Sequence, residues 1–413
     1  MSRDEAVHAQ YEGYPYPARD PADEARRLVT GSPSHLAEIN HYLFAGARRF
    51  GAGAPPFHAL IAGGGTGDGA IMLAQQLSDA GGVAEIVHLD LSRASSDIAK
   101  ARAKARKLGN IRFVIGSLLD LADLDLGTFD YIDCCGVLHH LADPPAGLRA
   151  LSDGLADDGG MGLMVYGTYG RTGVYPAQDA LKMLGGGDDD TQRLASARAL
   201  LADLPETNWL KRNPWLADHQ HGDDAGLYDL LLHARDRAYT VPDTFGLVDA
   251  SGLAITGFIE PARYDPATYL QDEGLATRAA ALPWRERCAL AELLAGSIKR
   301  HVCYVAKKCA EGRVAQPASG DMVPLLREGD ATEMAKGMAA TRRISADLEG
   351  LSVSHAVDRL APAILSRIDG RRSLTEIHAA MTGKTAWDDF KTAFDALYAV
   401  LNGINVMLLR CAD

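Results

Sequence analysis

Residues 60–69 read LIAGGGTGDG, a short apolar run followed by a turn in which Gly63, Gly65 and Gly67 stand at alternate positions. Glycine lets a backbone pass close to a ligand because it carries no Cβ. The next segment, 70–77, has helical character, and a helix N-terminus offers free N–H groups and the positive end of a dipole. This strand–turn–helix pattern predicts a site for an anionic ligand group at the start of the helix.

An acidic residue follows the glycine turn at the sequence spacing seen in nucleotide-binding proteins. Asp90 ends a second predicted strand, residues 84–91, 23 residues after Gly67. In nucleotide-binding strand–helix–strand units an acidic residue there accepts hydrogen bonds from ribose hydroxyls. Residues 65–70 also fit the relaxed dinucleotide fingerprint G-x-G-x-x-A, so a dinucleotide-dependent oxidoreductase is an alternative.

Strands and helices alternate through the first half of the chain. The predicted strands are 58–62, 84–91, 111–117, 129–136 and 161–167, with 254–260 and 301–308 as final strands. The predicted helices between them include 94–109 and 145–160. This alternation predicts an α/β fold with a doubly wound, mostly parallel seven-stranded sheet.

The flanking segments break the alternation. Residues 1–56 form an N-terminal extension in which 11–21, rich in Tyr and Pro, is expected to be extended. Residues 168–240 are expected to be an insertion in a core domain that spans 57–309. Beyond a polar linker, 320–413 show three short apolar helical faces and a terminal strand, which predict a winged-helix-like accessory domain.

Three further segments of the core carry a resemblance. They read IRFVIGSLLDL (111–121), FDYIDCCGVLHHLADP (129–144) and LADDGGMGLMVYG (155–167). In this order, after the glycine loop, they resemble class I S-adenosylmethionine (SAM)-dependent methyltransferases, particularly those related to small-molecule C- and O-methyltransferases. The resemblance covers about residues 57–167 and extends less clearly to 308. It implies a Rossmann-like fold, SAM as the cofactor and methyl transfer as the reaction.

The resemblance also implies which positions hold the cofactor. These are the glycine loop, the ribose-binding acid, two positions around the adenine and two beside the methionine part: Gly63, Gly65, Gly67, Asp90, Leu91, Ser117, Leu118, Cys135 and Gly136. The chain departs from the family twice. Ile61 stands where the family has an acid two residues before its first glycine, and Ser117 where it often has Asp. Because both departures remove carboxylates, a non-catalytic SAM-binding scaffold protein is a second alternative.

The acceptor side has no fixed signature. Methyl transfer depends on alignment, and a base is needed only when the acceptor arrives protonated. The expected catalytic residues are His139, His140 and Tyr166, although histidines here also pack or cap the next helix. The expected acceptor pocket contains Tyr11, Tyr14, Tyr16, Tyr169 and Arg171.

Charge limits the partners. The formal net charge is −12, and residues 320–413 carry 11 basic and 13 acidic residues, so nucleic acid is not expected. The sequence HQHGDD (219–224) matches no common metal spacing, and no metal is expected. Without an apolar leader or an 18-residue apolar run, a cytoplasmic protein with no membrane contact is expected.

Together these features predict a SAM-dependent methyltransferase that acts on an N or O acceptor of a protein or peptide. A methyltransferase for a small metabolite is the alternative within the same class. The C-terminal domain is expected to recruit a polypeptide substrate or to form a homodimer.

Overall fold

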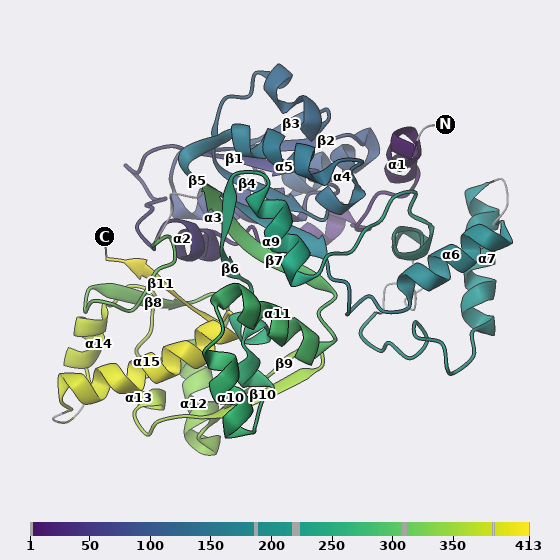
Figure 1. The fold of residues 1–413 in the computed structure, drawn as a ribbon. Coiled ribbons are helices and arrows are strands. Elements are labelled where there is room, and N and C mark those ends of the chain that lie inside the picture. Colours follow the sequence, from purple (N-terminus) through teal and green to yellow (C-terminus); the bar gives the residue numbers. More distant parts are fainter. Residues whose placement is uncertain are drawn as a thin grey trace.

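The computed structural model describes residues 3–185, 189–216, 224–307, 312–381, 383 and 385–412. Its centre is a seven-stranded sheet in the order β3-β2-β1-β4-β5-β7-β6 (Figure 1). Only β7 runs antiparallel to its neighbours in this sheet. The strands are β1 (Phe57–Ala62), β2 (Ala84–Asp90), β3 (Ile111–Ile115), β4 (Phe129–Cys135), β5 (Leu155–Tyr166), β6 (Leu253–Phe258) and β7 (Arg300–Lys307). The predicted α/β fold with a doubly wound, mostly parallel sheet is confirmed.

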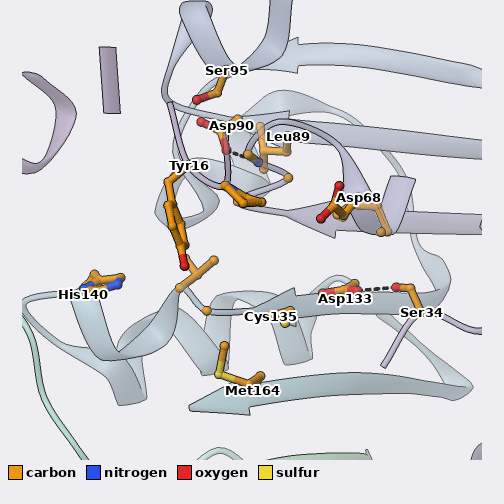
Figure 2. Close-up of a pocket in the computed structure, with 18 of the residues that line it drawn as sticks. Tyr16, Ser34, Asp68, Leu89, Asp90, Ser95, Asp133, Cys135, His140 and Met164 are labelled. Carbon is orange, nitrogen blue, oxygen red and sulfur yellow. Dashed lines mark hydrogen bonds between the residues drawn. The ribbon is translucent and has the colours of Figure 1, made fainter. Parts of the chain in front are cut away.

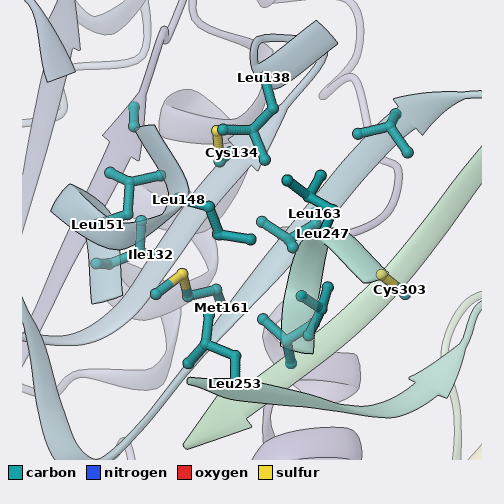
Figure 3. Close-up of a cluster of buried hydrophobic side chains, with 14 of the residues drawn as sticks. Ile132, Cys134, Leu138, Leu148, Leu151, Met161, Leu163, Leu247, Leu253 and Cys303 are labelled. Carbon is teal, nitrogen blue, oxygen red and sulfur yellow. The ribbon is translucent and has the colours of Figure 1, made fainter. Parts of the chain in front are cut away.

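Helices cover both faces of this sheet. On one face, buried side chains of β4 and β5 pack against α5 and α9, as Figure 3 shows for Leu148, Met161 and Leu247. On the other face, Tyr131 and Tyr304 pack with residues of α2 and α3. The helices of the core are α2 (Leu36–Leu43), α3 (Asp68–Ala80), α4 (Arg93–Ala105), α5 (Pro144–Asp153), α9 (Val241–Asp249), α10 (Glu273–Ala280) and α11 (Trp284–Ala295). Short 3₁₀ turns lie at Pro21–Ala25, Leu118–Leu124, Leu138–His140, Pro261–Tyr264 and Pro266–Thr268.

Two sequence predictions about local structure were wrong. Helix α1 runs from Arg3 to Gly13, so the first part of the segment 11–21 is helical, and only the Tyr-Pro part beyond Gly13 leaves the helix. Helix α5 ends at Asp153, and β5 already begins at Leu155, within the predicted helix 145–160. The β4–β5 register shifts near Phe129, which accommodates the polar start of β5.

The insertion forms a separate helical cluster beside the sheet. It contains α6 (Val174–Leu184), α7 (Asp190–Asp203) and α8 (Asp224–Leu227), followed by a π-helical turn, η4 (Tyr228–Leu232). Its apolar centre includes Val174, Leu181 and Leu231. Single π-helical turns are frequent at functional sites, and this one ends next to the cavity described below.

The C-terminal residues build their own hydrophobic core around Phe390, Phe394 and Leu401. Besides the three expected helices they contain a fourth helix and a β-hairpin, which the sequence did not reveal. The elements are β8 (Met322–Leu326), α12 (Ala331–Thr341), β9 (Arg343–Leu348), β10 (Leu351–Ala356), α13 (Ala361–Leu365), α14 (Leu374–Ala379), α15 (Trp387–Gly403) and β11 (Met407–Cys411). Helices with a hairpin suit the winged-helix prediction, which stays a prediction. Among the described residues, no helix is both long and apolar enough to cross a membrane.

Candidate functional site

A cavity of about 480 Å³ lies at the carboxyl ends of β1, β2, β4 and β5. The N-terminal residues fold over it, and Tyr16, Pro17 and Ser34 belong to its lining. Figure 2 shows Tyr16 reaching across the space between the glycine loop and β4. In open α/β sheets, ligands bind outside the carboxyl ends of the strands, so this cavity is where the fold predicts the cofactor.

The glycine loop needs its glycines for backbone reasons. Gly63 has φ +70° and Gly65 has φ +51°, a region that side chains rarely adopt. A Cβ at Gly63 would lie 2.4 Å from Cγ2 of Val137, and one at Gly65 would lie 2.9 Å from the carbonyl oxygen of Tyr16. Both glycines line the cavity, so the loop presents its backbone to a ligand there.

Gly67 has a different task. Its φ is +102°, it is the N-cap residue of α3, and it does not belong to the cavity lining. A Cβ on it would lie 2.8 Å from Cβ of Ala99, on α4. Gly67 therefore permits close packing of α3 on α4, and the structure does not place it at the predicted cofactor position.

Asp90 lies at the end of β2, directly beside the loop. Its Oδ2 accepts a 2.7 Å hydrogen bond from the backbone N–H of Gly65, and its Oδ1 accepts one of 2.7 Å from Ser92. A carboxylate has about four acceptor positions, so two remain for ribose hydroxyls. Asp90 thus fixes the loop and still presents acceptors to the cavity that it lines.

The other predicted cofactor residues line the same cavity. They are Leu91, Ser117 and Leu118 after β2 and β3, and Cys135 and Gly136 at the end of β4. The Ser117 hydroxyl accepts a hydrogen bond from the N–H of Leu119, which caps the turn that places Leu118. The lining therefore combines the residues that follow β2 and β3 with the glycine loop, the start of α3 and the end of β4.

The acceptor end of the cavity is a network of buried polar groups. Tyr11, His140, Tyr166 and Asp229 all line it, and they come from four separate parts of the chain. The Tyr166 hydroxyl donates a 2.9 Å hydrogen bond to Oδ2 of Asp229, and the Tyr11 hydroxyl lies 3.4 Å from Oδ1. Burial raises the pKa of both tyrosines well above the ordinary value, so both stay protonated and donate to this carboxylate.

The two adjacent histidines differ. His140 lines the cavity, and its Nδ1 lies 2.8 Å from the carbonyl oxygen of Arg235. Because a carbonyl only accepts, Nδ1 carries the proton, and Nε2 of the neutral ring keeps a free lone pair. His139 is fully buried, does not line the cavity and packs on Tyr166 with 4.0 Å between ring centroids. Burial holds the pKa of His139 well below its usual range, so this ring is a packing group.

Three predicted acceptor residues do not reach the cavity. Tyr14 stacks on Tyr228 of the insertion at 4.9 Å between ring centroids, and Tyr169 lies outside the lining. The guanidinium of Arg171 lies 3.7 Å from the ring centroid of Tyr166 and forms a 2.8 Å ion pair with Asp236. Arg171 therefore supports Tyr166 from behind. Of the predicted acceptor group, Tyr11 and Tyr16 line the cavity.

One group among the described residues has metal-like composition: His140, Asp229 and His233, whose ligand atoms lie within 4.8 Å of one another. The backbone N–H of Arg235 donates a 3.0 Å hydrogen bond to Nδ1 of His233. That bond places the proton of the neutral ring on Nε2, which lies 3.3 Å from the Tyr11 hydroxyl. A metal-binding histidine has the opposite arrangement, donating from the nitrogen that faces away from the metal. The geometry favours a proton-relay network. The sequence HQHGDD (219–224), at which no metal is expected, lies mostly outside the described residues.

Sequence reasoning missed several lining residues. Asp229 lies within the insertion, in η4, and has no local motif, so no pattern marked it. Asp133 had a signal, because it is an acidic residue inside the apolar strand FDYIDCC. Ser34 donates a hydrogen bond to its Oδ2 from the N-terminal segment, as Figure 2 shows. Asp68 of α3 also lines the cavity and pairs with Arg19 at 2.6 Å.

Comparison with known proteins agrees with this geometry. Residues 60–161 match the family model described as a methyltransferase domain. The chain is 31% identical over 301 residues to the uncharacterized protein syc1184_c of Synechococcus sp., covering 70% of this chain and 68% of that protein. The structure of PKMT2 from Rickettsia typhi in complex with AdoHcy aligns with a TM-score of 0.63 at 16% identity, covering 92% of this chain and 76% of that one. A second structure of PKMT2 from Rickettsia typhi aligns with a TM-score of 0.64 at 17% identity, covering 92% of this chain and 76% of that one. Identities this low show the shared fold.

A sheet of this order with a glycine loop on β1 and a carboxylate ending β2 defines a class I methyltransferase fold. The chain belongs to the class I SAM-dependent methyltransferase family, and its cofactor is S-adenosylmethionine. The residues present fit this cofactor, because the open backbone of the glycine loop, the Asp90 carboxylate and the buried carboxylate of Asp133 line one cavity.

Proposed function

We propose that this methyltransferase methylates an amine nitrogen, most simply a lysine side chain of a protein or peptide. When bound, the cofactor supplies an electrophilic methyl group on a positively charged sulfur. The acceptor end must then bind an ammonium ion, deprotonate it and align the free nitrogen.

The observation that carries the proposal is that His140 and Asp229 lie side by side, with a ring nitrogen and a carboxylate oxygen within 4.8 Å of each other. The fixed Nδ1 proton of His140 leaves Nε2 as the nitrogen that can take a proton from the acceptor. Asp229, which also lines the cavity and accepts from the Tyr166 hydroxyl, suits a cation because carboxylates attract ammonium groups. A neutral hydroxyl acceptor would gain less from this arrangement.

The size and charge of the molecule favour a polypeptide acceptor. A cavity of about 480 Å³ lies in the lower half of the range for small-molecule sites, so the cofactor takes up much of it. The remaining room suits a slender chain such as lysine. A net charge of −12 also favours encounter with basic polypeptides. A small-metabolite amine is the second candidate, because the same cradle would hold it.

Radiolabelled SAM separates these candidates. The protein is incubated with lysate protein freed of metabolites and with the metabolite fraction alone. It is also incubated with lysine-containing peptides in which the side-chain amine is either free or acetylated. Label in free lysine peptides and lysate protein supports the proposal. Label confined to metabolites, or unchanged by acetylation of the lysine, contradicts it.

The His140→Gln variant tests the base. General bases contribute about 100- to 10,000-fold, so the rate constant at pH 7.5 should fall by that order, with unchanged affinity for S-adenosylhomocysteine. Because lysine has a pKa of about 10.4, the variant should approach the wild-type rate near pH 10, where the amine is already free. A defect equal at both pH values would show a structural role.

A further inference from the structure

We call the part of the cavity lined by the glycine loop, the start of α3 and the ends of β2, β3 and β4 the donor half, and the part lined by Tyr11, His140, Tyr166 and Asp229 the acceptor half. Asp133 is a buried carboxylate in the donor half. It lies near the end of β4, is 3% exposed and belongs to the cavity lining. The Ser34 hydroxyl and the backbone N–H of Cys135 donate hydrogen bonds to it. Among the described residues, no lysine, arginine or histidine nitrogen forms an ion pair with it, and no cation contributes to its pKa shift.

A buried charge is costly unless an opposite charge compensates it. Burial raises the pKa of Asp133 to about 6, so the group is still mostly ionised at pH 7.5. The other two acids of the donor half are already engaged: Asp68 pairs with Arg19 and Arg102, and Asp90 accepts from two backbone N–H groups. Asp90 and Asp133 both lack a cation among the described residues, but Asp133 is the buried one of the two, so its charge is the more costly to leave uncompensated.

Its position relative to α3 indicates which cation it lacks. Oδ2 of Asp133 lies 3.1 Å from where a Cβ on Gly69 would be, so it borders the first turn of α3. The helix N-terminus attracts the cofactor's carboxylate. In an α-amino acid the ammonium and carboxylate share one carbon, so an acceptor for the ammonium must lie directly beside that helix end. Asp133 occupies such a position.

We propose that Asp133 binds the α-ammonium group of the cofactor's methionine part. The Ser34 hydroxyl, which donates a hydrogen bond to Asp133, orients the Asp133 carboxylate for this contact. Asp133 pairs in register with Ile61 on β1, and Ile61 also lines the cavity. The carboxylate missing at Ile61 is thus present one strand away. This role concerns cofactor binding alone and does not depend on the identity of the acceptor.

Three ligands and the Asp133→Asn variant test the proposal by calorimetry. SAM has both the ammonium and the sulfonium, S-adenosylhomocysteine has only the ammonium, and 5′-methylthioadenosine has neither. The variant should bind the first two about 10- to 100-fold more weakly, the range for a lost hydrogen bond to a charged group, and should bind 5′-methylthioadenosine unchanged. Loss confined to SAM would mean a sulfonium contact, and equal loss or no loss for all three would also overturn the proposal.

Two further variants complete the test. Asp130→Asn makes the same change on the same strand, outside the cavity, where Asp130 pairs with Arg48 at 3.3 Å; it should leave all three affinities unchanged. Ser34→Ala keeps the carboxylate but removes its orienting donor. Ser34→Ala should weaken the binding of SAM and S-adenosylhomocysteine by a smaller factor and leave the affinity for 5′-methylthioadenosine unchanged. This second variant keeps the proposal testable if Asp133→Asn fails to fold.

Discussion

The donor half and the acceptor half of the cavity are built in different ways. The donor half takes the glycine loop, Asp90, Ser117 and Leu118 from consecutive strand ends between Gly63 and Leu118. The acceptor half takes Tyr11, His140, Tyr166 and Asp229 from positions spread over 218 residues. The first is held by backbone hydrogen bonds that the fold itself imposes. The second is held by side chains, so it can change its substrate without a change of fold.

The difference predicts how each half fails. A change in the donor half should impair binding of every cofactor analogue that contains the affected group. A change in the acceptor half should leave cofactor affinity intact and alter turnover or the Michaelis constant for the acceptor. Variants confined to one half of the cavity therefore test this difference.

The largest effect is expected for Gly65→Val, which should abolish measurable binding of S-adenosylhomocysteine by calorimetry. Gly65 has φ +51°, and its Cβ would lie 2.9 Å from the Tyr16 carbonyl oxygen, so a branched side chain would strain the loop and displace the Tyr16 backbone, which also lines the cavity. Gly81→Val is the matched control, since Gly81 has φ +76° but nothing within 4 Å of a Cβ. Gly81→Val should bind S-adenosylhomocysteine normally. If it loses binding as Gly65→Val does, backbone strain in general explains the loss, and the position of Gly65 beside the cavity does not.

Asp90→Ala should weaken SAM binding by about 1.5–3 kcal/mol, the range for hydrogen bonds to a charged group. Asp90 also accepts the Gly65 N–H, so the loop contributes part of this loss. An analogue of S-adenosylhomocysteine without its 2′-hydroxyl separates the two parts. The variant should discriminate less between the analogue and the parent compound than the wild type does. Equal discrimination would remove the ribose assignment.

The sequence predicted Gly63, Gly65, Asp90 and the residues after β2, β3 and β4 as lining of the donor half because their determinants are local. Gly63, Gly65 and Asp90 act through backbone conformation and strand ends, and both features leave a trace at fixed spacing. Gly67 shows the limit of that reasoning, because the same residue type at the same period served helix packing against Ala99.

The sequence predicted only part of the acceptor half, because the determinants there are distant in the chain. His140 and Tyr166 follow recognisable strands, but their roles depend on Arg235 and Asp229, which the insertion brings back to the sheet. Nothing local distinguishes His140 from His139; the difference arises from which ring meets a carbonyl across 95 residues. The absence of an acid at Ile61 likewise seemed a defect until the β1–β4 register placed Asp133 beside it.

Asp133→Asn should stabilise the unliganded protein at pH 8 by on the order of 2 kcal/mol. The folded-state pKa is raised to about 6 from 3.8, so the ionised carboxylate penalises the folded state above pH 6. The penalty decreases as the pH falls through 6 and is absent below about 3.8, where both forms are protonated. Tyr131, Cys134 and Cys135 next to it have raised pKa values and stay neutral over this range.

Urea unfolding of wild type and variant at pH 8 and pH 5 measures this difference. The stability gap should narrow at pH 5, and saturating SAM should reverse it at pH 8 by stabilising the wild type more. A gap that is the same at both pH values would show that Asp133 does not titrate between them. A carboxylate that destabilises the unliganded protein but stabilises the SAM complex would support the placement of Asp133 in the donor half.

The smallest effect is expected for Tyr166→Phe on the acceptor side. The variant removes one hydroxyl that donates at 2.9 Å to Asp229, a hydrogen bond contributing about 1 kcal/mol, so the acceptor's Michaelis constant should rise roughly fivefold. Tyr239→Phe is the matched control, because its buried hydroxyl has no hydrogen-bond partner among the described residues. Cofactor affinity should stay unchanged in both variants. A shift in SAM affinity with Tyr166→Phe would show that the two halves are coupled through this residue, and the division between them would then hold for their construction but not for their energetics.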